Sequence, residues 1–202
     1  MKTFQETEFV IFDVETTGLS PGMGDRVIEV AALKVKNLEP VEEFHSFVNP
    51  GREISPGAFM VNGITTEMLA GSPRIERVLP RLLNFLANTV IVGHNIKFDL
   101  GFLNHEVRIA GIPWDKEWKT ICTIKMARSL LPGLGRYPLW LVARRLGVEA
   151  RQEHRALADV YLTLSVFRRL VEIAEKKSVI PGCLPAGRHS GGDNFRPSSN
   201  HE

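Results

Sequence analysis

Two acidic residues stand at the end of an apolar segment close to the start of the chain. Asp13 and Glu15 follow the apolar residues 9–12 and are separated by a single valine. Side chains alternate across a β-strand, so a strand through this segment would place both carboxylates on the same face. Two negative charges at one point of an apolar strand are costly unless a cation offsets their repulsion. The pair therefore predicts a divalent metal site.

Two further acids are candidates to complete that site. Asp99 lies near the start of a helical pattern, and Asp159 lies five residues after His154 at the start of another. An acid in the first turn of a helix is also favoured by the helix dipole, by about 0.3 to 1 kcal/mol, so either acid alone could be structural. Their combination with the pair on the strand favours a shared metal site.

The elements that must position these residues change period along the chain. The sequence predicts strands over residues 8–14, 26–36, 42–48, 89–92 and about 119–122. Helical spacing predicts a helix from a Ser72 N-cap to about residue 87, and further helices over residues 96–110, 123–131, 139–146 and 155–176. Residues 49–70 have turn chemistry with room for a helical turn or two. A meander followed by alternating strands and helices predicts an α/β protein with a mixed sheet flanked by helices.

Length and composition limit the class of protein. The 202 residues, 44% of them hydrophobic, suit one soluble globular domain. No apolar run reaches the roughly 18 to 20 residues of a membrane span, so we expect no signal peptide, no transmembrane helix and a cytoplasmic location. Residues 178–202 are rich in Gly, Pro and Ser, which predicts a folded domain over residues 1–177 and a flexible tail after it.

The charges are unevenly distributed, although the net charge is only +2. Residues 101–170 contain 12 Lys and Arg against 6 Asp and Glu, whereas residues 1–100 contain 9 against 13. A basic segment beside a metal site would suit a phosphate-bearing substrate. Arginine-rich helices that simply face solvent explain the same counts equally well.

Three separated motifs resemble those of the DnaQ-like (DEDDh) 3′–5′ exonuclease superfamily, and in particular its epsilon-type proofreading members. The motifs are Phe12-Asp13-Val14-Glu15-Thr16-Thr17-Gly18, His94-Asn95-Ile96-Lys97-Phe98-Asp99 and His154-Arg155-Ala156-Leu157-Ala158-Asp159. The resemblance covers residues 7 to about 174. It implies a ribonuclease H-like fold with a mixed five-stranded sheet, two Mg²⁺ or Mn²⁺ ions, and His154 as general base. The implied metal ligands are Asp13, Glu15, Asp99 and Asp159.

These residue types also make chemical sense without the resemblance. Hard carboxylate oxygens suit Mg²⁺ and Mn²⁺, whereas Cys or a cluster of His would indicate zinc. In a two-metal site one ion activates the attacking water and the other stabilises the leaving oxygen. An imidazole has an ordinary pKa of about 6.5, which suits removal of the proton from water and therefore the role of His154. His94 precedes Asn95 at a strand end, where turn hydrogen bonding is the expected role.

The resemblance further implies how the terminal nucleotide is held. The backbone of Thr16, Thr17 and Gly18 would approach it closely, and Leu19 would wedge near the last base. Phe98 or Phe102 would pack beside that base, although either could equally be a core residue of its helix.

Asn62 departs from the pattern of the family. Related proofreading sequences commonly have a His there, which is implied to touch the terminal nucleotide. An asparagine can still donate a hydrogen bond, but it carries no positive charge.

The sequence therefore predicts a metal-dependent 3′–5′ exonuclease that releases nucleoside monophosphates from single-stranded 3′ ends of DNA, with a DNA polymerase as a possible partner. An exoribonuclease that trims RNA is an alternative, because no residue can be assigned to reading the 2′-hydroxyl. A catalytically silent nucleic-acid-binding module on the same fold is another, since fold alone does not guarantee activity.

Overall fold

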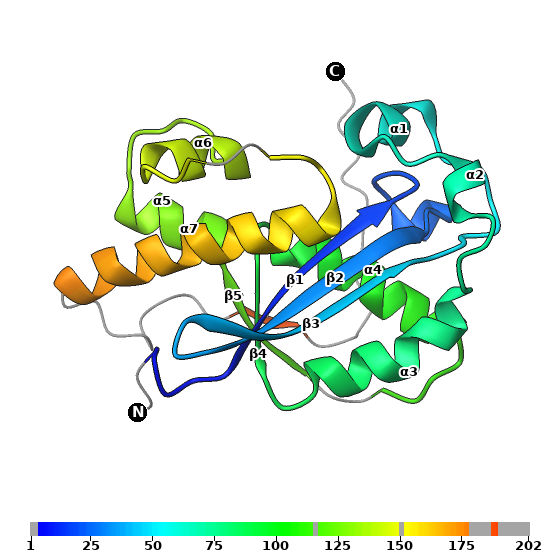
Figure 1. The fold of residues 1–202 in the computed structure, drawn as a ribbon, viewed down its shortest axis with the longest axis horizontal. Helices are drawn as coiled ribbons and strands as arrows, with labels where there is room; N and C mark the ends of the chain where they lie inside the picture. The colour runs from blue at the N-terminus through cyan, green and yellow to red at the C-terminus, as the bar shows by residue number, and fades with distance from the viewer. Residues whose placement is uncertain (1–3, 115–116, 150–151, 178–186, 190–202) are drawn as a thin grey trace, which may run out of the picture.

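A computed structural model describes residues 4–114, 117–149, 152–177 and 187–189 of the chain. Its centre is a mixed sheet with the strand order β3-β2-β1-β4-β5-β6 (Figure 1). The first five strands are the sheet expected from the sequence. Their bounds are Phe9–Thr16 for β1, Val27–Lys36 for β2, Glu39–Phe47 for β3, Val90–Gly93 for β4 and Trp118–Cys122 for β5.

The sheet combines both kinds of strand pairing. β1 pairs with β2, and β2 with β3, in antiparallel fashion, as expected for an opening meander. β4 and β5 are added in parallel on the other side of β1, which requires the helical crossover connections that the sequence provides. The pairing of β1 with β2 shifts register between Glu15 and Thr16, so the ladder is irregular where β1 ends.

A sixth short strand, β6 (Gly187–His189), pairs with β5 at the edge of the sheet. It lies inside the segment that the sequence predicted to be a flexible tail, so that prediction was wrong for these three residues. Main-chain pairing needs no apolar side chains, which explains why composition gave no sign of it. The rest of the predicted tail lies outside the described residues.

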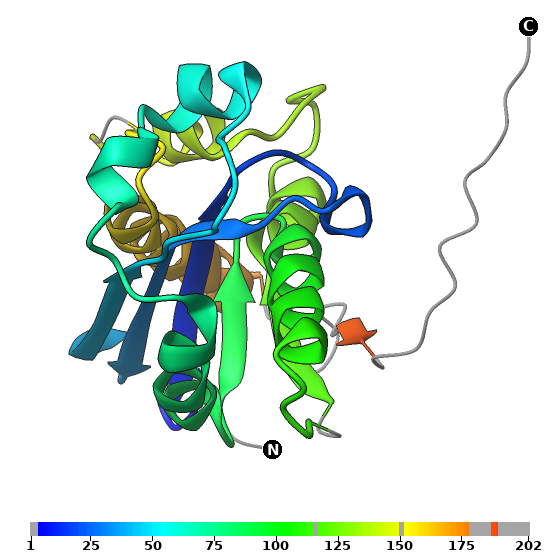
Figure 2. The same ribbon diagram turned by 90° about the vertical axis from the view of Figure 1, so that its right-hand side faces the viewer.

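Helices cover both faces of the sheet. α7 (Ala156–Lys176) packs against β1 and β2, with α5 (Thr123–Leu130) and α6 (Leu139–Arg145) beside it. α3 (Ile75–Leu86) and α4 (Ile96–Ile109) cover the opposite face, and Figure 2 shows α4 in front of the strands and α7 behind them. Alternate side chains of β1 point to opposite faces of the sheet, so the strand contributes to both apolar clusters. Phe9 and Ile11 pack on the α7 side, whereas Val10 and Phe12 pack on the side of α3 and α4.

The connection after β3 contains two short helices. α1 (Pro56–Asn62) begins at Ser55, whose side chain accepts a hydrogen bond from the Ala58 amide, and α2 (Thr66–Leu69) follows. α3 then begins after Arg74, so the predicted Ser72 cap was wrong. The Ser72 amide is instead hydrogen-bonded to the carbonyl of Leu69, and the extended Arg74 occupies the cap position without a side-chain hydrogen bond. In the described parts of the chain, no helix has both the length and the hydropathy that a membrane span requires.

Candidate active site

Three carboxylates converge at the end of β1. Oxygen atoms of Asp13, Glu15 and Asp159 all lie within 4.8 Å of one another. Asp13 and Glu15 share one face of β1 because they are two residues apart, and this is the face that α7 covers. Asp159 is buried in the first turn of α7 and completes the group from above the strand. The structure therefore brings together three of the four acids that the sequence predicts as metal ligands.

Asp99 reaches the same strand end from the other layer. It is buried in the first turn of α4, and its Oδ1 accepts a hydrogen bond from the backbone amide of Val14 at 3.2 Å. That hydrogen bond joins the start of α4 to β1 at Val14, the residue between Asp13 and Glu15. Asp99 is not one of the three mutually close carboxylates, but its negative charge acts on Asp13.

Burial and mutual repulsion disfavour the ionised forms of these four carboxylates and raise their pKa values. Burial, followed by the charge of Asp159, raises the pKa of Glu15 to about 8. Burial raises the pKa of Asp99 to about 7 and also raises the pKa of Asp159. For Asp13, burial and then the charges of Asp99 and Glu15 hold the pKa well above its ordinary value. A nearby cation would restore the ionised form of all four.

The donor set fits a hard divalent metal ion. Asp159 Oδ2 accepts a hydrogen bond from Gln152 Nε2 at 3.0 Å. Its Oδ1 is buried and finds no hydrogen-bond donor within the described residues. A buried carboxylate oxygen without a donor is costly unless something else binds it. All the converging groups are oxygen ligands, which is the chemistry that Mg²⁺ and Mn²⁺ prefer.

His154 lies beside this cluster, directly before α7. Its φ angle is +51°, an uncommon backbone conformation for a residue that is not glycine. Its Nδ1 lies 3.5 Å from Gln152 Nε2, and its charge, when present, favours ionisation of Asp159. The neighbouring structure must hold His154 in this conformation, since it costs free energy.

Glu29 supplies that anchor, and sequence reasoning missed it. Its side chain is fully buried (0% exposed) on β2 and accepts hydrogen bonds from Arg155 Nε at 3.0 Å and Nη2 at 3.2 Å. It also accepts one from the Ala156 amide at 3.2 Å, and its Oε1 lies 2.7 Å from His45 Nε2. Glu29 therefore fixes the two residues that follow His154. The available signal was an acid inside the apolar run of residues 27–33.

The carboxylate of Asp25 holds the turn after β1 through hydrogen bonds. This carboxylate accepts hydrogen bonds from Thr17 Oγ1 at 3.2 Å and from the Ser20 amide at 3.0 Å. A Cβ atom at Gly18 would collide with it, so the turn requires glycine at that position. Thr16 Oγ1 donates to the Gly18 carbonyl at 2.5 Å, which closes the turn from the strand side.

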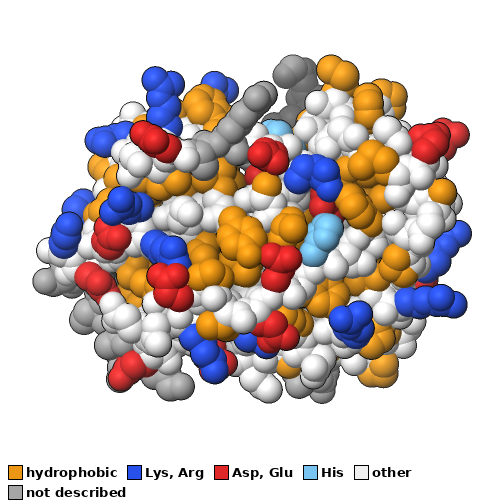
Figure 3. All heavy atoms as spheres, viewed as in Figure 1, with side chains coloured by type: hydrophobic (Ala, Val, Ile, Leu, Met, Phe, Trp, Pro, Cys, Tyr) orange, Lys and Arg blue, Asp and Glu red, His pale blue; other side chains and the backbone are white. Residues whose placement is uncertain are grey.

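Leu19 projects from this turn and is 84% exposed. Other exposed apolar side chains lie on α1 and α2, and hydrophobic atoms gather over α1 at the upper right of Figure 3. They are Phe59, Met60, Val61 and Met68. These surfaces would suit contact with a nucleotide base.

The remaining expected nucleotide contacts are placed differently from one another. Asn62 is only 6% exposed, and its Nδ2 lies 3.4 Å from the Thr16 carbonyl oxygen. Its hydrogen bond to Glu15 lowers the pKa of that carboxyl and so favours the ionised form.

Phe102 is 0% exposed, so the direct nucleotide contact expected for it is wrong. It packs in the core against the half-buried Phe98, with ring centroids 5.0 Å apart, and Phe98 alone of the two can offer a ring face.

His94 has a structural role, although not in a local turn. Its ring nitrogens lie 2.9 Å from Thr123 Oγ1 and 2.8 Å from the Tyr137 carbonyl oxygen. Burial lowers the pKa of His94 to about 4, so it is neutral at pH 7. The ring links β4, α5 and the segment before α6. The phenol of Tyr137 is itself engaged, donating to the Leu131 carbonyl at 3.0 Å.

Known sequences resemble most of the chain. The exonuclease family (RNase_T) matches residues 10–167. The PolC-type DNA polymerase III of Thermotoga petrophila is 41% identical over 175 residues, which are 86% of this chain and 12% of that protein. The PolC-type enzyme of Halalkalibacterium halodurans is 36% identical over 175 residues, 87% of this chain and 12% of that one. The chain thus spans about an eighth of the length of these curated relatives.

Solved structures share the architecture. Exonuclease X in complex with duplex DNA bearing a 5′ overhang superposes with a TM-score of 0.66 and 30% identity, covering 87% of this chain and 96% of that one. Exonuclease I of E. coli in complex with a dA16 oligonucleotide has a TM-score of 0.70 and 21% identity, covering 86% of this chain and 42% of that one. The expected ribonuclease H-like fold is thereby confirmed. From the match over residues 10–167, and in agreement with the three DnaQ-like motifs, the chain belongs to the RNase_T exonuclease family.

Proposed function

We propose that the protein is a 3′–5′ exonuclease that hydrolyses the last phosphodiester bond of single-stranded DNA and releases a nucleoside 5′-monophosphate. The observation that carries this proposal is the convergence of three carboxylates at the end of β1, one of which has a buried oxygen atom without a hydrogen-bond donor in the described chain. The names of the relatives favour DNA, because they are DNA polymerases and DNA-bound exonucleases. RNA stays an alternative substrate for the test.

Two Mg²⁺ or Mn²⁺ ions are the proposed cofactors. Asp13, Glu15 and Asp159 would hold one of them, and Asp99 would join Asp13 in holding the second. When bound, such ions supply the positive charge that stabilises the phosphate and make water more acidic.

The side chains around the ions have separate tasks. His154 would accept the proton of the attacking water, and Gln152 would keep Asp159 oriented through its hydrogen bond to Oδ2. Glu29 would hold the His154 backbone in place through Arg155 and the Ala156 amide.

The turn at residues 16–19 would receive the terminal nucleotide. The Leu19 side chain is exposed on this turn, and Phe98 offers a ring from α4. Apolar and aromatic contacts of this kind accept every base, which suits an enzyme that removes nucleotides without regard to sequence.

The test is release of mononucleotides from a single-stranded DNA oligomer that is labelled at its 5′ end. We expect stepwise shortening from the 3′ end that requires Mg²⁺ or Mn²⁺ and stops in EDTA. His154→Ala should lower kcat by about 100- to 10,000-fold, the usual contribution of a general base. His105→Ala, which removes an imidazole from α4 outside the carboxylate cluster, is the matched control.

Two results would contradict the proposal. If the native protein shortens neither DNA nor RNA in the presence of either metal, the catalytically silent nucleic-acid-binding module becomes the better interpretation. A native protein that degrades a matched RNA oligomer much faster than DNA would make it an exoribonuclease.

A further inference from the structure

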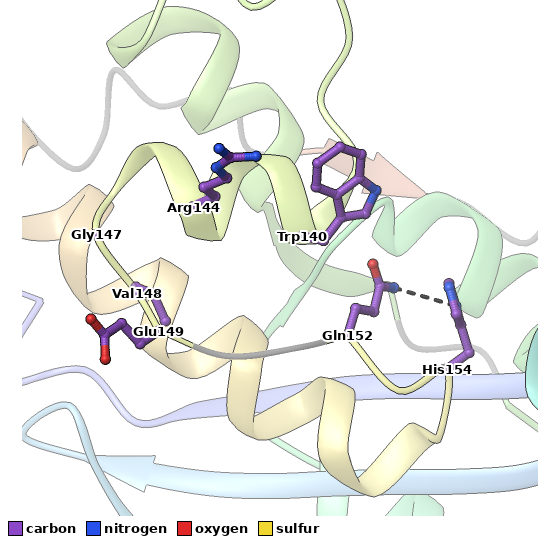
Figure 4. A pocket seen from close by; sticks show the side chains of 7 residues that line it. All are labelled: Trp140, Arg144, Gly147, Val148, Glu149, Gln152 and His154. Atoms are coloured by element: carbon purple, nitrogen blue, oxygen red, sulfur yellow. Dashed lines mark hydrogen bonds between the residues drawn. The ribbon is translucent and has the colours of Figure 1, made fainter.

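His154 is held only weakly through its own side chain. Within the described residues its ring has one hydrogen-bonding neighbour, Gln152, with 3.5 Å between His154 Nδ1 and Gln152 Nε2 (Figure 4). Hydrogen bonds of that length are weak. The backbone of His154 has a φ angle of +51°, which costs free energy and must be maintained by neighbouring contacts. The position of the imidazole therefore depends on the residues that follow it, Arg155 and Ala156.

Glu29 anchors those two residues, and Glu29 is itself held from the edge strand β3. Its Oε2 accepts hydrogen bonds from Arg155 Nε at 3.0 Å and from the Ala156 amide at 3.2 Å. A shorter contact, of 2.7 Å, joins its Oε1 to Nε2 of His45. Because the ionised carboxylate can only accept a hydrogen bond, His45 Nε2 is the donor. None of the roles proposed above uses His45.

The register of the sheet brings His45 and Phe47 to the face of Glu29. Phe47 is paired directly with Glu29 across β2 and β3, and His45 lies two residues earlier on the same face of β3. The guanidinium of Arg155 lies over the Phe47 ring, 5.1 Å from its centroid. The ring centroids of Phe47 and His45 are 5.4 Å apart. These side chains form a closed group that we call the Glu29 cluster, made of Glu29, His45, Phe47 and Arg155.

The Glu29 cluster links the protein surface to the interior. Glu29 is 0% exposed, whereas the side chains of His45 and Arg155 are 27% and 36% exposed. Water screens the exposed part of Arg155, which weakens its hold on Glu29. The donor on β3 binds Oε1, so it limits rotation of the carboxylate and keeps Oε2 directed at the Ala156 amide.

His45 can influence His154 only through Glu29. Within the described chain it has no hydrogen bond to the carboxylate cluster or to the turn of residues 16–19. Without His45 the Glu29 carboxylate could rotate and release the Ala156 amide, and the backbone of His154 could then relax from its unfavourable φ angle. A displacement of about 1 Å at a reacting group can cost about 100-fold in rate.

We propose that His45 is a positioning residue for His154, which it keeps directed at the attacking water by donating a hydrogen bond from Nε2 to Glu29 Oε1. The inference rests on the proposed exonuclease function and adds a residue of β3 to it. It assigns no contact between His45 and the substrate. A polar residue that merely stabilised the edge of the sheet would change the folded fraction and leave the rate per folded molecule unaltered.

Three substitutions at position 45 test this role by kinetics on a single-stranded DNA oligomer labelled at its 5′ end. His45→Ala removes the donor, and we expect kcat to fall by about 10- to 100-fold while KM stays the same. His45→Gln has an amide nitrogen as many bonds from Cβ as imidazole Nε2, so it should recover most of the lost kcat. His45→Asn has the same amide group on a shorter side chain, so it should behave like the alanine variant.

Glu43→Ala is the matched control. Glu43 lies two residues before His45 on the same face of β3, and its carboxylate accepts a hydrogen bond from Tyr161 of α7 at 2.8 Å. The variant therefore removes a contact between β3 and α7 that does not involve Glu29. We expect its kcat and KM to match those of the native protein. Urea unfolding of each variant gives the folded fraction by which kcat is corrected.

The pattern across the variants decides the proposal. It would be overturned by an unchanged kcat in His45→Ala, by a glutamine variant as slow as the alanine variant, or by an equal loss of kcat in Glu43→Ala. If the native protein releases no mononucleotides, the proposed function fails, and hydrogen exchange measured by NMR then tests the anchor alone. We expect the Ala156 amide to exchange about tenfold faster in His45→Ala than in native protein or His45→Gln, and equal exchange rates would refute the role of His45.

Discussion

Glu15→Gln should stabilise the metal-free protein while abolishing its activity. In the folded chain burial, together with the charge of Asp159, raises the pKa of Glu15 from 4.5 to about 8. The folded state therefore holds the Glu15 proton more tightly than the unfolded state does. Above pH 4.5 this difference penalises folding, and the penalty grows with pH until the pH passes about 8. Glutamine keeps the shape of the side chain and removes the penalty.

The magnitude follows from the interval between the two pKa values. At about 1.4 kcal/mol per pH unit, the interval from 4.5 to about 8 corresponds to at most about 5 kcal/mol. Because water reaches part of the Glu15 carboxylate, we expect about half of this, or 2 to 3 kcal/mol at pH 8. For a domain of this size that is a rise in Tm of roughly 4 to 12 °C.

Urea unfolding at pH 8 in EDTA measures the effect, with Glu53→Gln at an exposed loop position as the control. The difference between Glu15→Gln and native protein should shrink as the pH falls toward 4.5, because the native carboxyl is then protonated in both states. Saturating Mg²⁺ should stabilise the native protein more than the variant. A variant that is less stable than native protein in EDTA at pH 8, or a difference that does not change with pH, would refute this reasoning.

Two further substitutions test other parts of the site. Glu29→Gln should destabilise the fold, lowering the free energy of unfolding by about 2 to 4 kcal/mol, because it removes a buried charge that Arg155 and the Ala156 amide satisfy. Urea unfolding measures this loss, and kcat should fall as well. Unchanged values of both quantities would contradict the prediction. Gly18→Ala should cost about 1 to 3 kcal/mol and raise KM for oligonucleotides, because its Cβ would collide with the Asp25 carboxylate. Gly22→Ala, where a Cβ meets open space, is the matched control. Equal Tm values for the two alanine variants would show that the turn accommodates the Cβ at position 18 and would contradict the prediction.

The sequence predicted most elements of the fold because hydrophobic periodicity is a local property. β1, β4 and α7 begin and end within two residues of their expected positions. The same periodicity could not decide which of two aromatic residues on α4 faces the core, because Phe98 and Phe102 are one turn apart and share a face. The Ser72 cap was wrong because the chain stays extended through Arg74 and the helix begins two residues later than the motif indicated.

The convergence of three acids could be expected from the sequence, because Asp13 and Glu15 are two residues apart on a strand and Asp159 lies in a recognisable motif. Their role in binding metal stays a prediction. Glu29 lies in a strand without a motif and acts on residues more than a hundred positions later.

Glu15 and Glu29 illustrate how one sheet can hold two acids for opposite purposes. They are directly paired across the antiparallel ladder of β1 and β2, and the charge of Glu29 adds to the raised pKa of Glu15. Glu29 faces Arg155 and His45, so its charge is matched by groups of the protein itself. Glu15 faces Asp159 instead, and its charge finds no such match within the described chain.

This difference would let the proposed metal site be held rigidly before an ion binds. The charge of Glu29 is balanced from within, so it can fix the His154 segment before any ligand arrives. Within the described chain the carboxylates of the cluster have no positively charged partner, so ionising them costs free energy. A bound cation would offset that cost. Replacing Glu29 should therefore lower the stability of the fold with and without metal, whereas replacing Glu15 should raise stability without metal and reduce the stabilisation that metal provides.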